Sequence, residues 1–92
     1  MNQEPGELRK HITYEDQGDA ERFVNEILHK AKMKHGRGAF INKHEALGIL
    51  IEEIYELVKA VHSNDEEKVK HELADVALTA IWAIASIDVN AG

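Results

Sequence analysis

The chain has 92 residues, which indicates a single domain, and contains no cysteine, which excludes disulfides and thiolate metal sites. Its formal net charge of −6 excludes a broad nucleic-acid-binding surface. Hydrophobic residues make up 43% of the chain and charged residues 30%, as is typical of helix-rich globular proteins. The start lacks the apolar core of a signal peptide, and the longest apolar run, VALTAIWAIASI, is too short to span a bilayer. We therefore expect a cytoplasmic protein with no membrane partner.

The N-terminal part divides into an arm and the start of a helical domain. Residues 1–18 carry proline and glycine without a sustained period, so we expect an irregular arm ahead of one domain over 19–92. Asp19 is a candidate cap for a helix over about 20–35, and Gly36 is a candidate stop. The apolar stripe of this predicted helix consists of Phe23, Val24, Ile27, Leu28 and Ala31.

A second helix is predicted over residues 43–62. Asn42 with Glu45 three residues later has the pattern of a capping box. Apolar residues then recur at helical spacing: Leu47, Leu50, Ile51, Ile54, Leu57, Val58 and Val61.

A third helix is predicted over about 65–88. Its start signal is either Ser63 with Glu66 or Asn64 with Glu67. No pattern of alternating residues predicts a strand anywhere in the chain. The sequence therefore predicts an all-α fold.

Acidic residues of the second helix lie beside its apolar side. At about 100° per residue, Glu53 and Glu56 border the apolar arc, whereas Glu52 turns further toward water. Small or apolar residues share the stripe of Glu53 and Glu56. This arrangement predicts two carboxylates at the edge of a buried surface.

The third helix is apolar nearly all round from Leu73 to Ile87, which is typical of a helix buried on most sides. Its polar residues and its tryptophan fall within about 80° of one another, which indicates a lined cavity. They are Glu72, Asp75, Thr79, Trp82 and Ser86.

Two carboxylate pairs on neighbouring helices, Glu53 with Glu56 and Glu72 with Asp75, need positive charge between them if they converge. Oxygen ligands alone favour Mg²⁺, Mn²⁺ or Ca²⁺ over zinc or copper, and Mg²⁺ commonly bridges carboxylates to phosphates. Two alternatives remain open. The pairs are ordinary solvated faces, or the bundle holds two irons, for which the chain offers only one E-x-x-H motif, Glu26 with His29.

The segments EEIYEL and HELAD resemble the E-E-x-x-E and E-x-x-D signature of the MazG-like all-α nucleoside triphosphate pyrophosphohydrolases. The resemblance extends over about residues 44–85. It implies hydrolysis of a Mg²⁺-bound nucleoside triphosphate between the α and β phosphates, with Mn²⁺ as an alternative metal. It also implies that Glu53, Glu56, Glu72 and Asp75 are catalytic metal ligands, with Glu52 behind them.

Many family members carry a further helix or basic tail after the E-x-x-D helix, whereas the sequence here ends at Gly92. We therefore expect phosphate-binding cations in the segment KAKMKHGRGAFINKH, ahead of the second helix. Candidate substrate-binding residues are Lys32, Lys34, Arg37, Lys43, Thr79 and Trp82. A solvated basic turn is the alternative.

A 92-residue chain buries a modest core, and the third helix is too apolar for an exposed face. We therefore predict a helical bundle completed by homo-oligomerisation, as a homodimer or homotetramer. The predicted function is nucleotide-pool house-cleaning. The alternative is a non-catalytic helical protein that binds nucleotide or metal.

Overall fold

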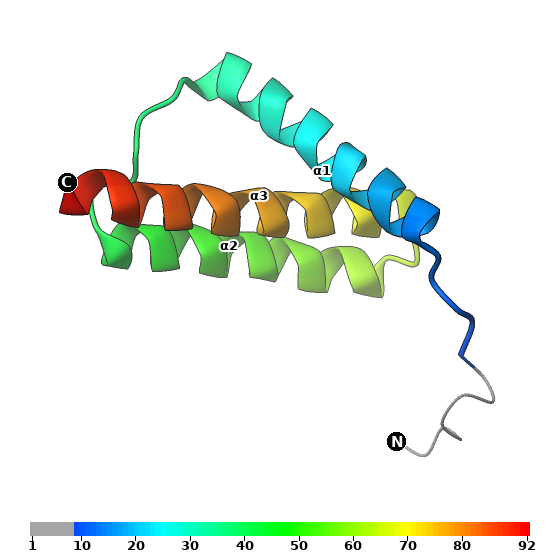
Figure 1. Ribbon diagram of the computed structural model, residues 1–92. Helices are drawn as coiled ribbons and strands as arrows, with labels where there is room; N and C mark the ends of the chain where they lie inside the picture. Colours follow the sequence, from blue (N-terminus) through cyan, green and yellow to red (C-terminus); the bar gives the residue numbers. More distant parts are fainter. Residues whose placement is uncertain (1–8) are drawn as a thin grey trace.

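The computed structural model describes residues 9–92. This part of the chain consists of α1 (Tyr14–His35), α2 (Lys43–His62) and α3 (Glu66–Ala91), and it contains no strand (Figure 1). The predicted all-α fold is confirmed.

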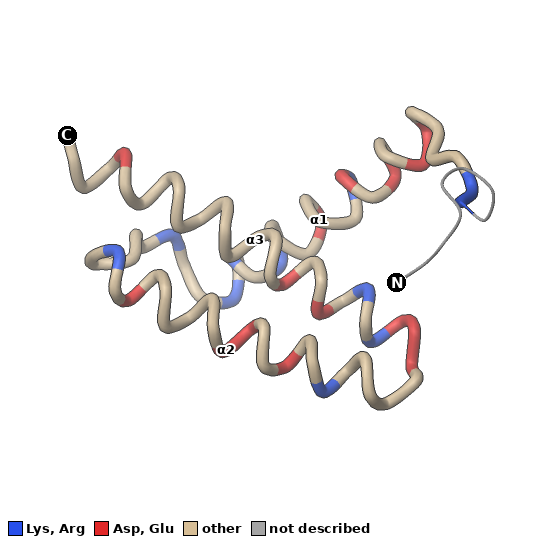
Figure 2. The backbone as a smooth tube through the Cα atoms, turned by 90° about the horizontal axis from the view of Figure 1, so that it is seen from below, with Lys and Arg blue, Asp and Glu red and all other residues tan. Residues whose placement is uncertain are grey.

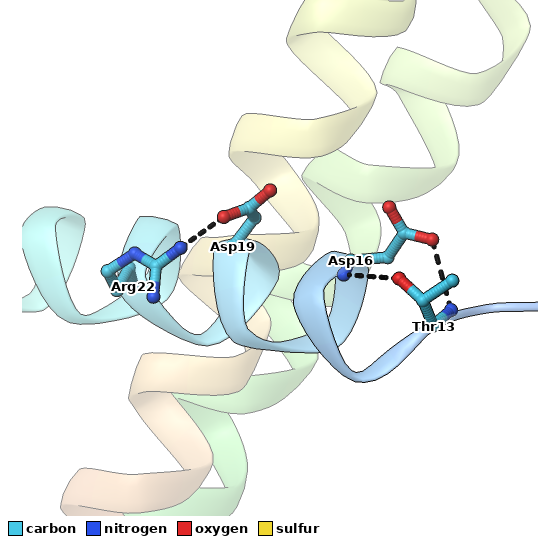
Figure 3. Close-up of polar contacts among 4 residues, drawn as sticks. All are labelled: Thr13, Asp16, Asp19 and Arg22. Atoms are coloured by element: carbon cyan, nitrogen blue, oxygen red, sulfur yellow. Dashed lines mark hydrogen bonds and ion pairs between the residues drawn. The ribbon is translucent and has the colours of Figure 1, made fainter.

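Helix α1 begins earlier than predicted. Thr13 is its N-cap: the Thr13 hydroxyl accepts a hydrogen bond from the Asp16 backbone N–H, and the Asp16 carboxylate accepts one from the Thr13 N–H, both at 3.0 Å (Figure 3). The predicted cap Asp19 lies inside the helix and pairs with Arg22. The predicted arm is therefore wrong for residues 14–18, because aspartate replaces the usual glutamate or glutamine of the capping box. Residues 1–8 of that arm lie outside the described part of the chain.

The predicted end of α1 and the predicted bounds of α2 are confirmed. Gly36 has a φ of 86°, a left-handed value that glycine adopts without strain, and its N–H donates to the Lys32 carbonyl at 2.8 Å. Asn42 caps α2 by accepting hydrogen bonds from the backbone N–H groups of His44 and Glu45. The reciprocal bond of the expected capping box is displaced, because Glu45 accepts from Ile41 instead of Asn42.

Helix α3 starts from a different cap than either predicted one. Asp65 is the N-cap and accepts from the Lys68 N–H at 3.2 Å. Asn64 has a φ of 61°, so it makes the left-handed turn between α2 and α3, a conformation that asparagine tolerates better than most residues. The helix also continues to Ala91, beyond the predicted end at residue 88.

Helix α3 lies between the other two. It packs against α2 on one flank and against α1 on the other, while α1 and α2 do not pack on each other (Figure 1). The short turn after His62 makes α2 and α3 an antiparallel hairpin. Helix α1 crosses α3 obliquely, and the linker after α1 returns to the C-terminal part of α3.

The core of the single chain is small. The buried apolar residues are Ala46 and Ala60 of α2 with Ala74 and Leu78 of α3, so small side chains let the helices approach closely. Helix α3 is less buried than predicted, since Leu73 is 49% exposed and Ile84 is 63% exposed in the single chain. The reason is that α1 and α2 cover only its two flanks.

Candidate metal and nucleotide site

The carboxylates of Glu53, Glu72 and Asp75 converge across the interface between α2 and α3. One oxygen from each residue lies within 4.8 Å of the others, and all three residues are half-buried. Glu72 and Asp75 are three residues apart, so they project from neighbouring positions on one helix, while Glu53 approaches from the antiparallel partner. Figure 2 shows the acidic positions of α2 beside those of the N-terminal half of α3. We call these three residues the acidic cluster.

The close approach of the three carboxylates affects the pKa of Glu53. Burial raises the pKa of its carboxyl group above the ordinary range, and the nearby charges of Asp75 and Glu72 raise it further. Both effects disfavour the ionised form: a carboxylate in a partly dry site loses hydration, and the neighbouring carboxylates repel it. A bound cation would remove both penalties.

The remaining acidic candidates lie at the edge of the cluster. Glu56 does not share the close oxygen contact of the other three; its side chain is 48% exposed and pairs with Lys59 at 3.3 Å. Its charge and that of Glu52 still add to the raised pKa of Glu53. Glu52 is exposed, as predicted from its helical position. The role of Glu56 as a ligand stays a prediction.

The acidic cluster fits a hard divalent cation. All three donors are carboxylate oxygens, the ligand type that Mg²⁺, Mn²⁺ and Ca²⁺ prefer. Glu53, Glu72 and Asp75 would hold such a cation, since one oxygen of each lies within 4.8 Å of the others. Asp75 has one further contact, with the His71 imidazole Nδ1 at 3.6 Å, which is an ion pair when the imidazole is protonated.

The E-x-x-H pair does not contribute to this site. Glu26 and His29 both lie exposed on α1, which packs on the other flank of α3. Within residues 9–92 the acidic cluster is the one group of close metal-ligating side chains, and it contains no histidine. The geometry therefore favours an oxygen-ligated cation over the di-iron alternative.

Three of the predicted substrate-binding residues come together near the C-terminal half of α3. The Lys32 ammonium lies 3.7 Å from the centre of the Trp82 ring, and the Arg37 guanidinium carbon lies 5.2 Å from it. These distances are typical of cation–π contacts. Burial, and then the charge of Arg37, lower the pKa of Lys32. Two cations from separate segments thus share one aromatic side chain.

The other three candidates are not part of this group. Lys34 and Lys43 are exposed, and neither makes an ion pair or cation–π contact within the described chain. Thr79 is only 4% exposed, so its hydroxyl is covered by protein in the single chain.

Sequence reasoning missed how the linker between α1 and α2 is held. Trp82 donates from its indole N–H to the Gly38 carbonyl at 2.8 Å, and the Ser86 hydroxyl accepts from the Phe40 N–H at 2.9 Å. Asn90 donates to the Phe40 and Ile41 carbonyls at 2.8 and 3.2 Å. The signal in the sequence was the spacing of four residues between these side chains, which places them on one face of a helix.

Converging carboxylates on an antiparallel helical hairpin define an all-α protein with a candidate divalent-cation centre. A family model described as the MazG nucleotide pyrophosphohydrolase domain matches residues 42–91, more than half of the chain and the whole region that supplies the acidic cluster. The chain therefore belongs to the MazG family, and the resemblance seen in the motifs is confirmed. Membership indicates nucleotide pyrophosphohydrolase activity.

The other comparisons gave no match. Neither the curated proteins nor the solved structures include one that is significantly similar to this chain. In the described part of the chain, no helix has the length and apolar character needed to cross a membrane.

Proposed function

We propose that the protein hydrolyses a nucleoside triphosphate to the monophosphate and pyrophosphate in a Mg²⁺-dependent reaction, with Mn²⁺ as an alternative metal. Its role would be house-cleaning of the nucleotide pool. The observation that carries the proposal is the convergence of Glu53, Glu72 and Asp75 inside the region that matches the MazG domain.

The acidic cluster would hold the cation, and Glu56 would join it by leaving Lys59. A bound divalent metal supplies charge neutralisation at phosphoryl oxygens and lowers the pKa of a water ligand. The chain's own contribution is to fix three carboxylates in a partly dry site, which strengthens electrostatic interactions there. His71 would keep the Asp75 carboxylate oriented, and Glu52 would remain behind the ligands.

Lys32 and Arg37 would bind phosphate oxygens of the substrate. Trp82 lies seven residues beyond Asp75, so the ring is about 10.5 Å further along α3 and about 20° round from it. The cation pair and the acidic cluster therefore face the same side of α3. Opposite charges on one face suit a metal-bound polyphosphate, whose anionic chain would contact both.

A second copy of the chain would complete the bundle. On α2 the large exposed aliphatic residues lie about 80–160° round from Glu53, and on α3 three of them, Leu73, Ile84 and Ile87, lie about 120–180° round from Asp75. Because the helices are antiparallel, both faces turn to the side of the hairpin opposite Trp82. We name this surface the apolar face; it consists of Leu47, Ile51, Ile54, Val58 and Val61 with Leu73, Ile84 and Ile87. It supports a homodimer or a homotetramer.

The test is pyrophosphate release from a panel of canonical and damaged nucleoside triphosphates with Mg²⁺. We expect release with at least one of them, abolished by EDTA and reduced by orders of magnitude in Glu53→Gln and Asp75→Asn. The thermal shift produced by Mg²⁺ is measured in parallel. A thermal shift with Mg²⁺ but no turnover of any nucleotide would contradict the proposed activity. It would support the alternative of a non-catalytic protein that binds nucleotide or metal.

A further inference from the structure

Three side chains on one stripe of α3 hold the linker that follows α1. Trp82, Ser86 and Asn90 are spaced by four residues, and each bonds the linker backbone through the contacts given above. Successive members are rotated by about 40° round the helix. The linker therefore crosses α3 from the flank that carries α1 to the flank that carries α2.

Ser86 is the most buried of these three side chains. It is 4% exposed, and its hydroxyl donates to the Trp82 carbonyl at 2.7 Å while accepting from the Phe40 N–H. The donor and the acceptor roles of the hydroxyl are thus both occupied. Asn90 adds an amide that donates to two successive carbonyls, so it opposes any lifting of the linker from the helix.

Arg37 lies between two anchored residues. On one side the Gly36 N–H bonds to the Lys32 carbonyl, and on the other the Gly38 carbonyl accepts from Trp82. The same indole thus fixes the backbone beside Arg37 and carries both cations on its ring. Within residues 9–92 neither Lys32 nor Arg37 forms an ion pair with a carboxylate.

We propose that Ser86 and Asn90 are positioning residues that, through the linker, hold Lys32 and Arg37 as an anion-binding pair over Trp82. The inference rests on the proposed function for the chemistry of the anion, a di- or triphosphate group. Two cations held together without a carboxylate repel one another, and a polyanion relieves that repulsion. The lowered pKa of Lys32 agrees with this reading, since burial and Arg37 both disfavour its charge.

The experiment uses Trp82 as its own reporter, because it is the single tryptophan of the chain. The intrinsic fluorescence of the full chain is titrated with inorganic tripolyphosphate in EDTA, so that neither a metal nor turnover is required. We expect the fluorescence of the wild type to change saturably with tripolyphosphate. This saturable change should be lost in Lys32→Ala and in Arg37→Ala. Lys30→Ala, which removes one exposed charge from the same helix, should bind as the wild type does.

The positioning variants keep both cations. We expect Ser86→Ala and Asn90→Ala each to weaken tripolyphosphate binding by about three- to tenfold, the usual effect of losing one or two hydrogen bonds. Asn90→Gln, which retains the amide donor, should recover part of that loss. Val89→Ala is the matched control, since Val89 is exposed next to Asn90 and makes no hydrogen bond from its side chain. Asn90 is exposed, so its variants leave the buried core intact.

The outcomes separate this inference from the proposed function. Wild-type affinity in both Ser86→Ala and Asn90→Ala would overturn the positioning role, and an unchanged signal in Lys32→Ala would overturn the anion-binding pair. Tripolyphosphate binding without nucleotide turnover would contradict the proposed enzymatic activity and would still support the anion-binding pair. If turnover is found, the positioning variants should raise KM with kcat nearly unchanged, because the pair binds the phosphates equally in ground and transition states.

Discussion

At the scale of single residues, Glu53 shows how a like-charge cluster is tolerated. It projects from α2 toward Glu72 and Asp75, and burial raises its pKa above the ordinary range. No Lys or Arg follows Lys70 in the chain, so α3 brings no counter-charge of its own beside Asp75. The repulsion among the three carboxylates is therefore uncompensated on α3, and a bound cation would relieve it.

We predict that Glu53→Gln melts a few degrees above the wild type in EDTA at neutral pH. The folded pKa of Glu53 is raised, so its stabilising protonation is complete below the ordinary glutamate pKa and is lost as pH rises through the folded value. The advantage of the variant should accordingly shrink as pH falls toward about 4, near the ordinary pKa of glutamate. Thermal melts across this pH range measure it, and an advantage that grows on acidification would contradict the argument.

Glu56 and Glu52 provide a second comparison at this scale. We expect Glu56→Gln to melt at or above the wild-type temperature in EDTA and to lose most of the rise in melting temperature that Mg²⁺ produces, because ligand binding stabilises only through the native site. Its pyrophosphohydrolase activity should fall by orders of magnitude. Glu52→Gln, at an exposed position, should change all three quantities much less. A wild-type Mg²⁺ shift and wild-type turnover in Glu56→Gln would remove Glu56 from the site.

At the scale of elements, the helix ends decide where the functional groups stand. The cap at Asn42 and the stop at Gly36 define the linker that presents Arg37, and the turn at Asn64 makes α2 antiparallel to α3. That antiparallel pairing is what brings Glu53 opposite Glu72. The N-terminal half of α1 packs on the part of α3 that carries the acidic cluster, since the centre of the Phe23 ring lies 6.4 Å from that of the His71 imidazole.

We predict that Thr13→Ala destabilises the protein by about 1 kcal/mol, the usual loss for an N-cap hydroxyl. For a domain of this size, that loss lowers the melting temperature by about 4–8 °C. Thr13→Ser keeps the acceptor for the Asp16 N–H and should melt close to the wild type. Thermal denaturation measures both variants. Equal melting of wild type and Thr13→Ala would mean that the first turn of α1 adds nothing to stability.

At the scale of the whole molecule, one side of the hairpin formed by α2 and α3 is uncovered by any other part of residues 9–92. The apolar face collects large exposed side chains from α2 and α3, whereas three of the four buried apolar residues are alanines. Exposed apolar surface of this kind supports the proposed contact with a second copy. The acidic cluster and the linker occupy the opposite side, so a second copy would pack behind the site and leave its open side accessible.

We predict that the protein is a homodimer or homotetramer at micromolar concentration, and that the double variant Ile54→Lys with Val58→Lys is a monomer. Charges placed in the apolar face prevent burial against a second copy. Light scattering after size-exclusion chromatography measures the mass. Tyr14→Lys, a charge placed at the exposed start of α1, is the control and should keep the wild-type mass. A monomeric wild type would contradict the predicted assembly.

The sequence by itself determined the three helices, the bounds of α2, the stop at Gly36 and the family. These features depend on the helical spacing of apolar residues and on cap residues, and both are specified by neighbours along the chain. It also placed Glu53 and Asp75 on the inner stripes of their helices. Thr13 as a cap escaped prediction because the expected pattern was tied to glutamate, although Asp16 makes the same two bonds.

Only the tertiary structure decided which candidates meet. Four carboxylates share the predicted stripes, yet three converge, because α2 turns Glu53 directly toward α3 and leaves Glu56 beside Lys59. Four basic candidates come from one segment, yet Lys32 and Arg37 alone among them reach Trp82, because the linker is bonded to α3 through side chains about fifty residues away. Such contacts depend on the crossing of helices and on the path of the linker, and neither is encoded in local spacing.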